Sequence, residues 1–388
     1  MGVDVLDCEH KTPKARESGY PYIAIPDVQA GRIDTSKSRL ISGEDLAEWN
    51  RRTTPRAGDV LVTRRGRVGD SAPIPEGVSL AIGQNLVLLR SRRDMIDQGY
   101  LRWAARSPQW WSEVDRLRNV GAVFSSLNVK DISRIRIPVP PLTTQRSIAE
   151  VMGALDDEIA ANTKTANLSD QLSSALFHDS LRHASWSGKP FADLATISGG
   201  GTPSTKVPEY WDGDVNWATP TDVTGLDGLY LGATKRRITQ AGFQACSSAL
   251  YQPGAILMTS RATIGAFAIA QQPTAVNQGF IVVQPVDPKL KWWLFHEMRS
   301  RVDEFLSLAN GATFLELSRG NFRRLDVRMA EESVMYKFDA RAQRLHDAAA
   351  AAFDENRTLA AVREALLPQL MSGNVRVKDA EKVVEGAL

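Results

Sequence analysis

The residues best suited to chemistry in this chain are arginines and amides that follow short apolar runs. Arg64, Arg65 and Arg67 stand among glycines directly after the run Val60–Thr63. A guanidinium binds guanine O6 and N7 through two hydrogen bonds, and it binds phosphate oxygens equally well. The loop therefore predicts contact with a nucleic acid, and a solvated surface loop is the alternative for any one of these residues.

Side-chain amides form a second candidate set. Gln84–Asn85 and Asn277–Gln278 occur in two similar loops, and Asn or Gln can read adenine through N6 and N7. Turn formation is the alternative, because Asn beside Gly readily adopts a positive φ angle. Further candidate DNA contacts, for which solvated strand ends and structural turns stay open, are Lys11, Thr12, Thr202, Ser204, Lys235, Arg236, Arg237, Thr259, Ser260 and Arg261.

No catalytic or metal site is predicted. The glycine-rich stretch Ser198–Lys206 lacks the Gly-Lys-Ser/Thr order of a phosphate-binding loop. We find neither the motif of amino-group methylation nor a Pro-Asp followed by Glu-x-Lys, the pattern of metal-dependent cleavage. Cys8 and Cys246 are too few for a four-thiolate metal site. No metal-ligand spacing occurs among the five histidines, which are His10, His178, His183, His296 and His346.

The elements that carry these residues are duplicated along the chain. The two candidate loops recur in the same order, with an offset of roughly 190–196 residues. Gly58–Gly69 matches Gly254–Gly265, Ala81–Val87 matches Ala275–Ile281, Tyr22–Val28 matches Trp217–Val223, and Gly121–Phe124 matches Gly311–Phe314. Each copy opens with short β-type runs and continues into tryptophan-rich helical stretches, so each copy is predicted to be a mixed α/β module.

Each module is followed by a long amphipathic helix. Apolar residues recur at 4-3 spacing at Ile148, Met152, Leu155 and Ile159, and resume at Leu168, Leu172 and Leu176. The second series is Phe338, Ala342, Leu345, Ala349, Ala352, Asn356, Leu359, Arg363, Leu366 and Leu370. This spacing is typical of a coiled-coil seam, and Asn162 and Asn356 lie on it, where a buried Asn can fix the register. Helices of ~35 residues would be about 50 Å long.

These patterns predict an α/β (α+β) chain with two modules related by a pseudo-twofold axis and two long helices that pair antiparallel. The modules span 1–142 and 185–330, the helices 143–184 and 331–373, and a tail 374–388. Lys and Arg outnumber Asp and Glu in the modules (22 against 17, and 14 against 12) but not in 143–184 (3 against 6) or in 331–388, the second helix with the tail (8 against 10). Two basic modules on a rigid spacer suit duplex DNA with two separated half-sites.

Composition excludes several other classes of protein. The chain has 388 residues, of which 43% are hydrophobic and 24% charged, as in ordinary folded proteins. No apolar run approaches the roughly 20 residues of a membrane span. The first ten residues lack the basic and apolar regions of a secretory signal, and the two cysteines cannot form a disulfide framework. The expected location is therefore the cytoplasm, with no membrane as a partner.

In four stretches the chain resembles the DNA-specificity subunit of type I restriction-modification systems. They are Asp7–Pro13, Gly200–Ser204, Pro138–Gln145 and Leu366–Gly373. The resemblance implies two target-recognition domains, each reading half of an asymmetric bipartite site, and two spacer helices that dock two methyltransferase (M) subunits. It also implies S-adenosylmethionine in those subunits, ATP and Mg²⁺ in a restriction (R) subunit, and no cofactor in this chain. Unlike the first module, the second has a lead-in, Trp186–Ala195, and the helix after it lacks a proline-rich start.

Two hypotheses therefore compete, with a third of lower weight. The first is a non-catalytic DNA-reading adaptor within a methyltransferase and endonuclease complex. The second is a self-sufficient DNA-modifying or DNA-cleaving enzyme whose site has no recognised motif. The third is a coiled-coil interaction protein that binds no nucleic acid, which salt-dependent retention on duplex DNA would exclude.

Overall fold

The structure is a computed structural model that describes residues 2–9, 11–29, 31–92, 94–120, 125–311 and 315–387. His10, the repeat block 121–124 and most of its counterpart 311–314 lie outside the described residues. The chain divides into two compact units. The first unit comprises Met1–Ile159 and Arg357–Leu388, and the second comprises Ala160–Asn356. Each unit therefore contains one module and part of each long helix.

The first module is built on a four-stranded antiparallel sheet of order β1-β9-β6-β7. Its strands are β1 (Val3–Asp7), β6 (Val60–Thr63), β7 (Ser71–Pro73) and β9 (Leu86–Ser91). Strand β6 is buried throughout because its alternate side chains enter different cores. Val60 and Val62 join the core shared with the helices, whereas Leu61 joins a second core on the opposite face.

Short elements complete the first module. A second sheet has the order β5-β2-β8, from β2 (Tyr20–Ile23), β5 (Arg39–Ile41) and β8 (Ala81–Ile82). The small strands are β3 (Val28–Gln29), β4 (Arg32–Ile33), β10 (Asn119–Val120) and β11 (Ser125–Ser126), with a 3-10 turn η1 (Ile25–Asp27). The helices are α1 (Gly43–Trp49), α2 (Gln98–Ala104), α3 (Pro108–Leu117) and α4 (Val129–Ile132). Ser42, Asp97 and Ser107 begin the first three of these helices by accepting backbone N–H bonds.

The second module repeats this plan with additions. Its main sheet has the order β13-β20-β17-β18-β15, and two further sheets have the orders β16-β14-β19 and β12-β21. The strands are β12 (Ser185–Pro190), β13 (Ala195–Ser198), β14 (Trp211–Ala218), β15 (Tyr230–Leu231), β16 (Arg237–Ile238), β17 (Ile256–Thr259), β18 (Phe267–Ala270), β19 (Thr274–Val276), β20 (Phe280–Pro285) and β21 (Asp326–Met329). The helices are η2 (Leu181–His183), α6 (Phe191–Leu194), η3 (Pro208–Tyr210), α7 (Pro220–Thr224), α8 (Gln240–Ala245), η4 (Pro288–Leu290), α9 (Lys291–Arg299), α10 (Val302–Ser307) and α11 (Arg319–Arg323).

The predicted duplication is confirmed by strand register. Val60 pairs with Leu89 and Thr63 with Leu86 in the first module. The matching pairs in the second are Ile256 with Val283 and Thr259 with Phe280. The two modules therefore share a mixed α/β core built from equivalent strands.

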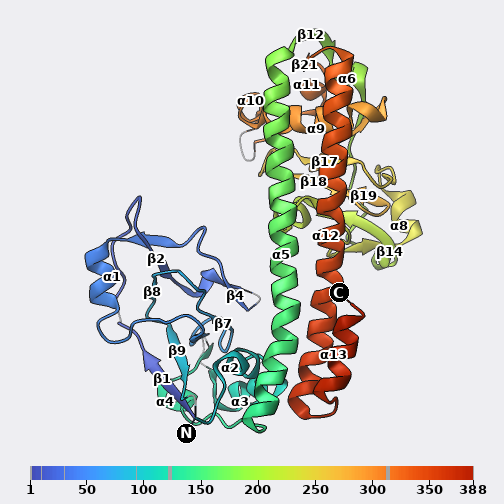
Figure 1. The fold of residues 1–388 in the computed structure, drawn as a ribbon. Helices are drawn as coiled ribbons and strands as arrows, with labels where there is room; N and C mark the ends of the chain where they lie inside the picture. Colours follow the sequence, from blue (N-terminus) through green and yellow to red (C-terminus); the bar gives the residue numbers. More distant parts are fainter. Residues whose placement is uncertain are drawn as a thin grey trace. The chain divides into compact units, whose positions relative to one another are not determined.

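Two long helices follow the modules, α5 (Leu142–Ser180, 39 residues) and α12 (Glu332–Ser372, 41 residues). Within each unit they lie side by side (Figure 1). In the second unit Thr163 contacts Asn356, and Ser173, ten residues later, contacts His346, ten residues earlier. The helix segments of the second unit are therefore antiparallel. In the first unit Asp156 of α5 binds Arg363 of α12 at 2.5 Å.

Most of the predicted seam is buried in its own unit. Ile148, Met152, Leu155 and Ile159 pack with Leu359, Leu366 and Leu370 in one core of the first unit, and Phe338 lies in the main core of the second. Asn162 is half-buried, and Asn356 donates its side-chain N–H to the Thr163 hydroxyl at 3.1 Å. A short helix, α13 (Val377–Glu385), lies in the predicted tail and packs Ala380 and Val384 into the first core.

Part of the predicted seam is wrong. Leu168 and Leu172 are about half exposed, and Leu345 is only half-buried. The buried residues in their places are Ala166, Ser169, Ser173, Phe177 and His346. Small side chains at Ala166, Ala349 and Ala352 pack together where the helices meet. The spacing of apolar residues in the sequence does not reveal this buried helix face, because the polar residues Ser169, Ser173 and His346 belong to it.

Candidate nucleic-acid interface

In the first module three predicted contacts line one polar hollow. Thr12, Gln84 and Asn85 surround a cavity of about 400 Å³. The turn that carries the two amides is held by backbone bonds, from Gly83 N–H to the Ile23 carbonyl (2.8 Å) and from Leu86 N–H to the Gly83 carbonyl (3.0 Å). The Gln84 side chain is exposed and can reach an external partner.

Lys37 and Arg39 line the same hollow and were missed from the sequence. Pairing of β2 with both β5 and β8 brings their loop to the amide turn. Arg39 donates to the Pro13 carbonyl at 2.7 Å, while Asp27, the acid in the hollow, accepts the Ala24 N–H at 2.7 Å. Lys37 and Arg39 therefore share the hollow with a single carboxylate, Asp27, which already accepts a backbone hydrogen bond. No local motif signals this, because the two loops are more than forty residues apart.

The three arginines after β6 have different roles. Arg64 donates to the Gln84 carbonyl at 2.9 Å, which ties this loop to the amide turn. Arg67 donates to the carbonyls of Ile25 and Val28, so it holds η1 in place. Arg65 is exposed. Of the three, Arg65 is best placed for phosphate contact.

Lys11 lies in a loop held by aromatic donors. Its carbonyl accepts from the Trp49 indole N–H (3.1 Å) and the Tyr22 hydroxyl (3.2 Å). Its ammonium is 3.6 Å from a Glu48 carboxylate oxygen, and both side chains are about half exposed or more. An exposed ion pair of this kind contributes little stability, so the Lys11 side chain is available to a phosphate.

In the second module a hydrogen bond joins the loop of Thr202 to the amide loop of Gln278. Thr202 donates its hydroxyl to the Gln278 side-chain carbonyl at 2.6 Å. Below it, Gly201 N–H binds the Val276 carbonyl (3.1 Å) and the Trp217 indole binds the Gly201 carbonyl (3.0 Å). Thr202, Ser204 and Gln278 are all exposed.

The basic run Lys235–Arg237 is exposed. The Arg236 guanidinium lies 3.6 Å from the centre of the Trp211 ring. Stacking on an aromatic face restrains an arginine while leaving its N–H edge free for an anion. Lys235 N–H donates to the Asp222 carboxylate at 2.9 Å, which fixes the start of the run.

Two predicted contacts of the second module are buried in the fold. Thr259 and Ser260 are buried at the end of β17, the central strand of the sheet. The Thr259 hydroxyl accepts the Ala266 N–H, and the Ser260 backbone bonds to Gly279 and Leu317. Arg261 stays half exposed and pairs with Glu316 at 2.9 Å. The Asn277 side-chain oxygen accepts the Gly279 N–H at 2.8 Å, so this amide stabilises the turn.

Two described titratable groups near these loops, Cys8 and Tyr22, are buried. Burial raises the pKa of the Cys8 thiol to about 11, and its S–H donates to the Gly83 carbonyl. Burial also raises the pKa of Tyr22. Among the described residues no three His, Cys, Asp or Glu side chains are grouped to hold a metal ion. Nor does any described helix combine the length and apolarity needed to cross a membrane.

Gly200→Ala is expected to destabilise the second unit by about 3 kcal/mol, since an added Cβ would stand 1.8 Å from the Val276 carbonyl oxygen. The loop that presents Thr202 would shift with it. Urea unfolding of the full chain measures the loss. Gly320→Ala is the matched control, because Ser318 Oγ, at 3.9 Å, is the nearest atom outside the helix backbone. It should leave stability unchanged or raise it by up to about 1 kcal/mol, since Ala is the better helix former. Equal effects would contradict the close approach.

Comparison with known proteins agrees with this geometry. The sequence profile described as the type I restriction modification DNA specificity domain matches the chain twice, at residues 8–169 and 184–329. The chain belongs to this family and carries two copies of its domain.

Individual relatives match over shorter stretches. The chain is 36% identical over 144 residues to the type I restriction enzyme MjaIX specificity subunit of Methanocaldococcus jannaschii, which covers 37% of this chain and 33% of that protein. It is 23% identical over 193 residues to the HindI specificity subunit of Haemophilus influenzae, which covers 49% and 42% respectively. The matches thus span less than half of either relative.

One solved structure shares the fold over nearly the whole chain. It is the type I restriction-modification system S subunit from M. genitalium, with a TM-score of 0.57 and 13% sequence identity. The alignment covers 95% of this chain and 93% of that one. At this identity the similarity concerns the fold.

Proposed function

We propose that this chain is the non-catalytic specificity subunit of a type I restriction-modification complex and reads an asymmetric bipartite DNA sequence. The observation that carries the proposal is the pair of specificity domains together with α5 and α12, each of which continues without a break from one compact unit into the other. At ~1.5 Å per residue, a 39-residue helix is about 58 Å long, far more than one module needs.

The two modules offer different reading surfaces, which supports an asymmetric site. The first presents Lys37, Arg39 and Gln84 around a hollow, and the second presents Thr202–Gln278 and the stacked Arg236. Unlike donors and acceptors recognise unlike bases, so each module would read its own half-sequence.

Catalysis would belong to partner subunits. Two methyltransferase subunits would supply S-adenosylmethionine chemistry, and a restriction subunit would use ATP and Mg²⁺. The half-exposed Leu168 and Leu172 on α5 support docking of a protein on this helix, since they face solvent four residues apart.

Spacing of the half-sites tests the proposal. We expect a seven-residue insertion between Asn162 and Thr163, matched by one between Asn356 and Arg357, to lengthen the gap between half-sites by about three base pairs. Seven residues add ~10.5 Å of helix against ~3.4 Å per base pair. The insertion points face each other, because Thr163 contacts Asn356. Methylome sequencing of cells that carry the complete complex would give both the half-sequences and the gap.

The control is the seven-residue insertion in α5 alone. It puts the contacts between α5 and α12 out of register, so we expect it to abolish DNA modification and not to lengthen the gap between half-sites. An unchanged gap with the matched insertions would refute the spacer role. Methylation or cleavage by the purified chain alone, with S-adenosylmethionine or Mg²⁺, would favour a self-sufficient enzyme over an adaptor.

A further inference from the structure

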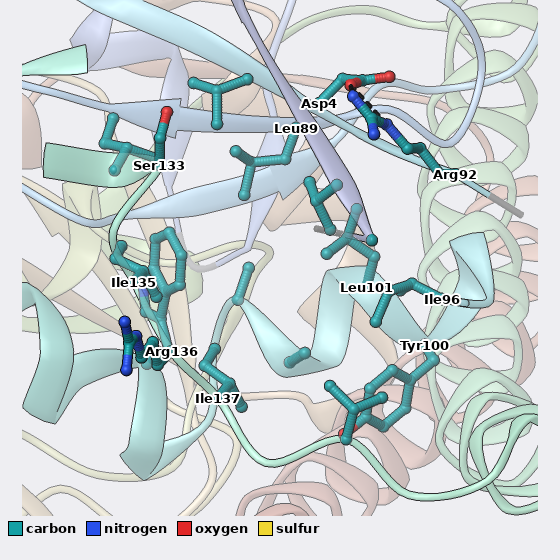
Figure 2. Close-up of a pocket in the computed structure, with 18 residues that line it drawn as sticks. Asp4, Leu89, Arg92, Ile96, Tyr100, Leu101, Ser133, Ile135, Arg136 and Ile137 are labelled. Carbon is teal, nitrogen blue, oxygen red and sulfur yellow. Dashed lines mark hydrogen bonds and ion pairs between the residues drawn. The ribbon is translucent and has the colours of Figure 1, made fainter. Parts of the chain in front are cut away.

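The first unit contains two hollows that differ in chemistry. One is apolar, with side chains such as Leu101 around it, and Asp4 among its lining residues is already paired with Arg92 at 2.5 Å (Figure 2). The other is the polar hollow of the amide turn, which has Asp27 in its wall. Bases are distinguished through hydrogen-bond donors and acceptors, so the polar hollow is the one that can discriminate between them.

The Asp27 carboxylate has one oxygen to spare. Its first oxygen accepts the Ala24 N–H at 2.7 Å and thereby holds the start of η1. Its second oxygen makes no hydrogen bond or ion pair with the described residues. The side chain is half-buried and lines the hollow. An acceptor is therefore available to a group that enters there.

The second module makes the same cap without a spare oxygen. One oxygen of Asp222 accepts the Thr219 N–H at 2.8 Å, and the other accepts the Lys235 N–H at 2.9 Å. The Asp222 residue is buried, with 7% of its surface exposed. Capping alone therefore requires neither an exposed carboxylate nor a free oxygen.

The strands after the cap fix which residues correspond. Strand β5 ends at Ile41 and β16 at Ile238, both fully buried, and in each module the hydroxyl of the next residue caps the following helix. Counting back three residues places Ser38 where the second module has Lys235. The Ser38 N–H bonds instead to the Thr35 carbonyl at 3.3 Å, so it does not fill the second oxygen of the first cap.

Two exposed cations line the same hollow as this acceptor. The Lys37 ammonium forms neither a hydrogen bond nor an ion pair within the part of the chain that the structure describes. Arg39 donates one N–H to the Pro13 carbonyl at 2.7 Å, which restrains its guanidinium. The hollow therefore offers an acceptor and a charged donor together.

An acceptor together with a charged donor matches a C·G base pair in the major groove. Cytosine presents its N4 amino group there, and guanine presents O6 and N7 as acceptors. Carboxylates accept from cytosine N4, and Lys or Arg donates to guanine. Adenine also presents an amino group, but this group lies between two acceptors, adenine N7 and thymine O4, which would repel a carboxylate.

We propose that Asp27 is a specificity-determining residue of the first module: its free carboxylate oxygen accepts the N4 amino group of a cytosine, while Lys37 donates to the paired guanine. The inference rests on the proposed function and narrows it, because the half-sequence of the first module would contain a C·G pair. Phosphates repel an acid in a DNA interface, and the hydrogen bond from the base offsets this cost. The second module would read its half-sequence without this contact, since both oxygens of Asp222 are occupied.

Asp27→Asn tests the assignment in cells that carry the complete complex. The asparagine oxygen can still accept the Ala24 N–H, whereas an NH2 group replaces the free acceptor. Methylome sequencing should show the preference for C·G at one position of one half-sequence reduced by at least about tenfold, with the other half-sequence unchanged. Asp34→Asn is the matched control, because Asp34 is exposed in the same module and its carboxylate accepts the Ser36 N–H at 2.9 Å. It removes the same charge and should leave both half-sequences unchanged.

A base analogue tests the same contact in the purified complex. Replacing the cytosine by 2-pyrimidinone, which lacks the amino group, should weaken duplex binding by the wild-type complex about tenfold. The complex with Asp27→Asn should bind the two duplexes within about twofold of each other, since the acceptor is already absent. Lys37→Gln should reduce the preference at the same base pair, and its exposed side chain makes the variant safe for folding.

The outcomes separate this inference from the proposed function. A C·G preference that depends on both Asp27 and the cytosine amino group supports the inference. An unchanged half-sequence with Asp27→Asn would overturn it, as would a wild-type complex that tolerates 2-pyrimidinone at each cytosine of the half-sequence that Lys37→Gln alters. Bipartite modification would persist in both cases, so the proposed function would stand. A wild-type complex without bipartite modification would overturn both. The measurements on the wild-type complex and on Lys37→Gln decide the matter even if Asp27→Asn does not fold.

Discussion

Lowering the pH from 7.5 to 5 should destabilise the second unit by about 3 kcal/mol. Two buried histidines cause this. Nε2 of His296 lies 3.2 Å from Nε2 of His346, and the Ser173 hydroxyl contacts both rings. Trp292 stacks on His346 with ring centres 3.6 Å apart. No carboxylate hydrogen bonds to either ring in the described part of the chain, so a proton gained there would be a poorly compensated charge.

The direction follows from the pKa values. Burial lowers the pKa of His296 to about 2 and that of His346 to about 3, against about 6.5 unfolded. The unfolded chain therefore binds protons first, and stability present above pH 6.5 is lost as the pH falls below it. Each histidine contributes a loss of about 2 kcal/mol by pH 5. Burial raises the pKa of Asp339 to about 6, so this group gains its proton in the folded state and offsets about 1 kcal/mol.

Hydrogen exchange of α9, followed by mass spectrometry and corrected for intrinsic rates, measures this stability in the full chain. The His296→Gln/His346→Gln double variant should be less stable at pH 7.5 but should lose little more on acidification. His178→Gln is the matched control, because His178 is exposed on α5, the helix that carries Ser173. A wild-type stability that does not change with pH would contradict the prediction.

Glu297→Gln should cost the second unit about 3–4 kcal/mol. The carboxylate is fully buried and lies between two arginines, 3.1 Å from Arg301 and 2.8 Å from Arg328. Arg301 is itself buried, with 5% of its side chain exposed. Removing the charge leaves the buried Arg301 paired with the partly exposed Glu304 alone and takes the carboxylate away from Arg328, which is far more costly than loss of a surface pair.

Glu304 provides the control within the same cluster. It also binds Arg301, at 2.7 Å, but its side chain is 40% exposed. Glu304→Gln should therefore cost under about 1 kcal/mol. Thermal unfolding of both variants at one pH compares them directly. Equal losses would show that burial of Glu297 is not the cause of its effect.

The strands, the duplication and the two long helices can all be predicted from the sequence. Runs such as Val60–Thr63 and Ile256–Thr259 recur with the same spacing, and the 4-3 series from Ile148 to Ile159 identifies a helix. These signals are local, since periodicity along the chain is set by how each element buries one or both faces.

Other features came from contacts between distant residues. Lys37 and Gln84 line the same hollow because strands far apart in the sequence pair in one sheet. His296 contacts His346 because α9 packs against α12. Conversely, Thr259 and Ser260 have the composition of a polar loop but are buried at the end of the central strand β17, and Leu168 has the spacing of a seam residue but is about half exposed. Residue type and local spacing predict which elements form. Which face of an element is covered depends on the partners that the folded chain brings to it, and no short stretch of sequence contains that information.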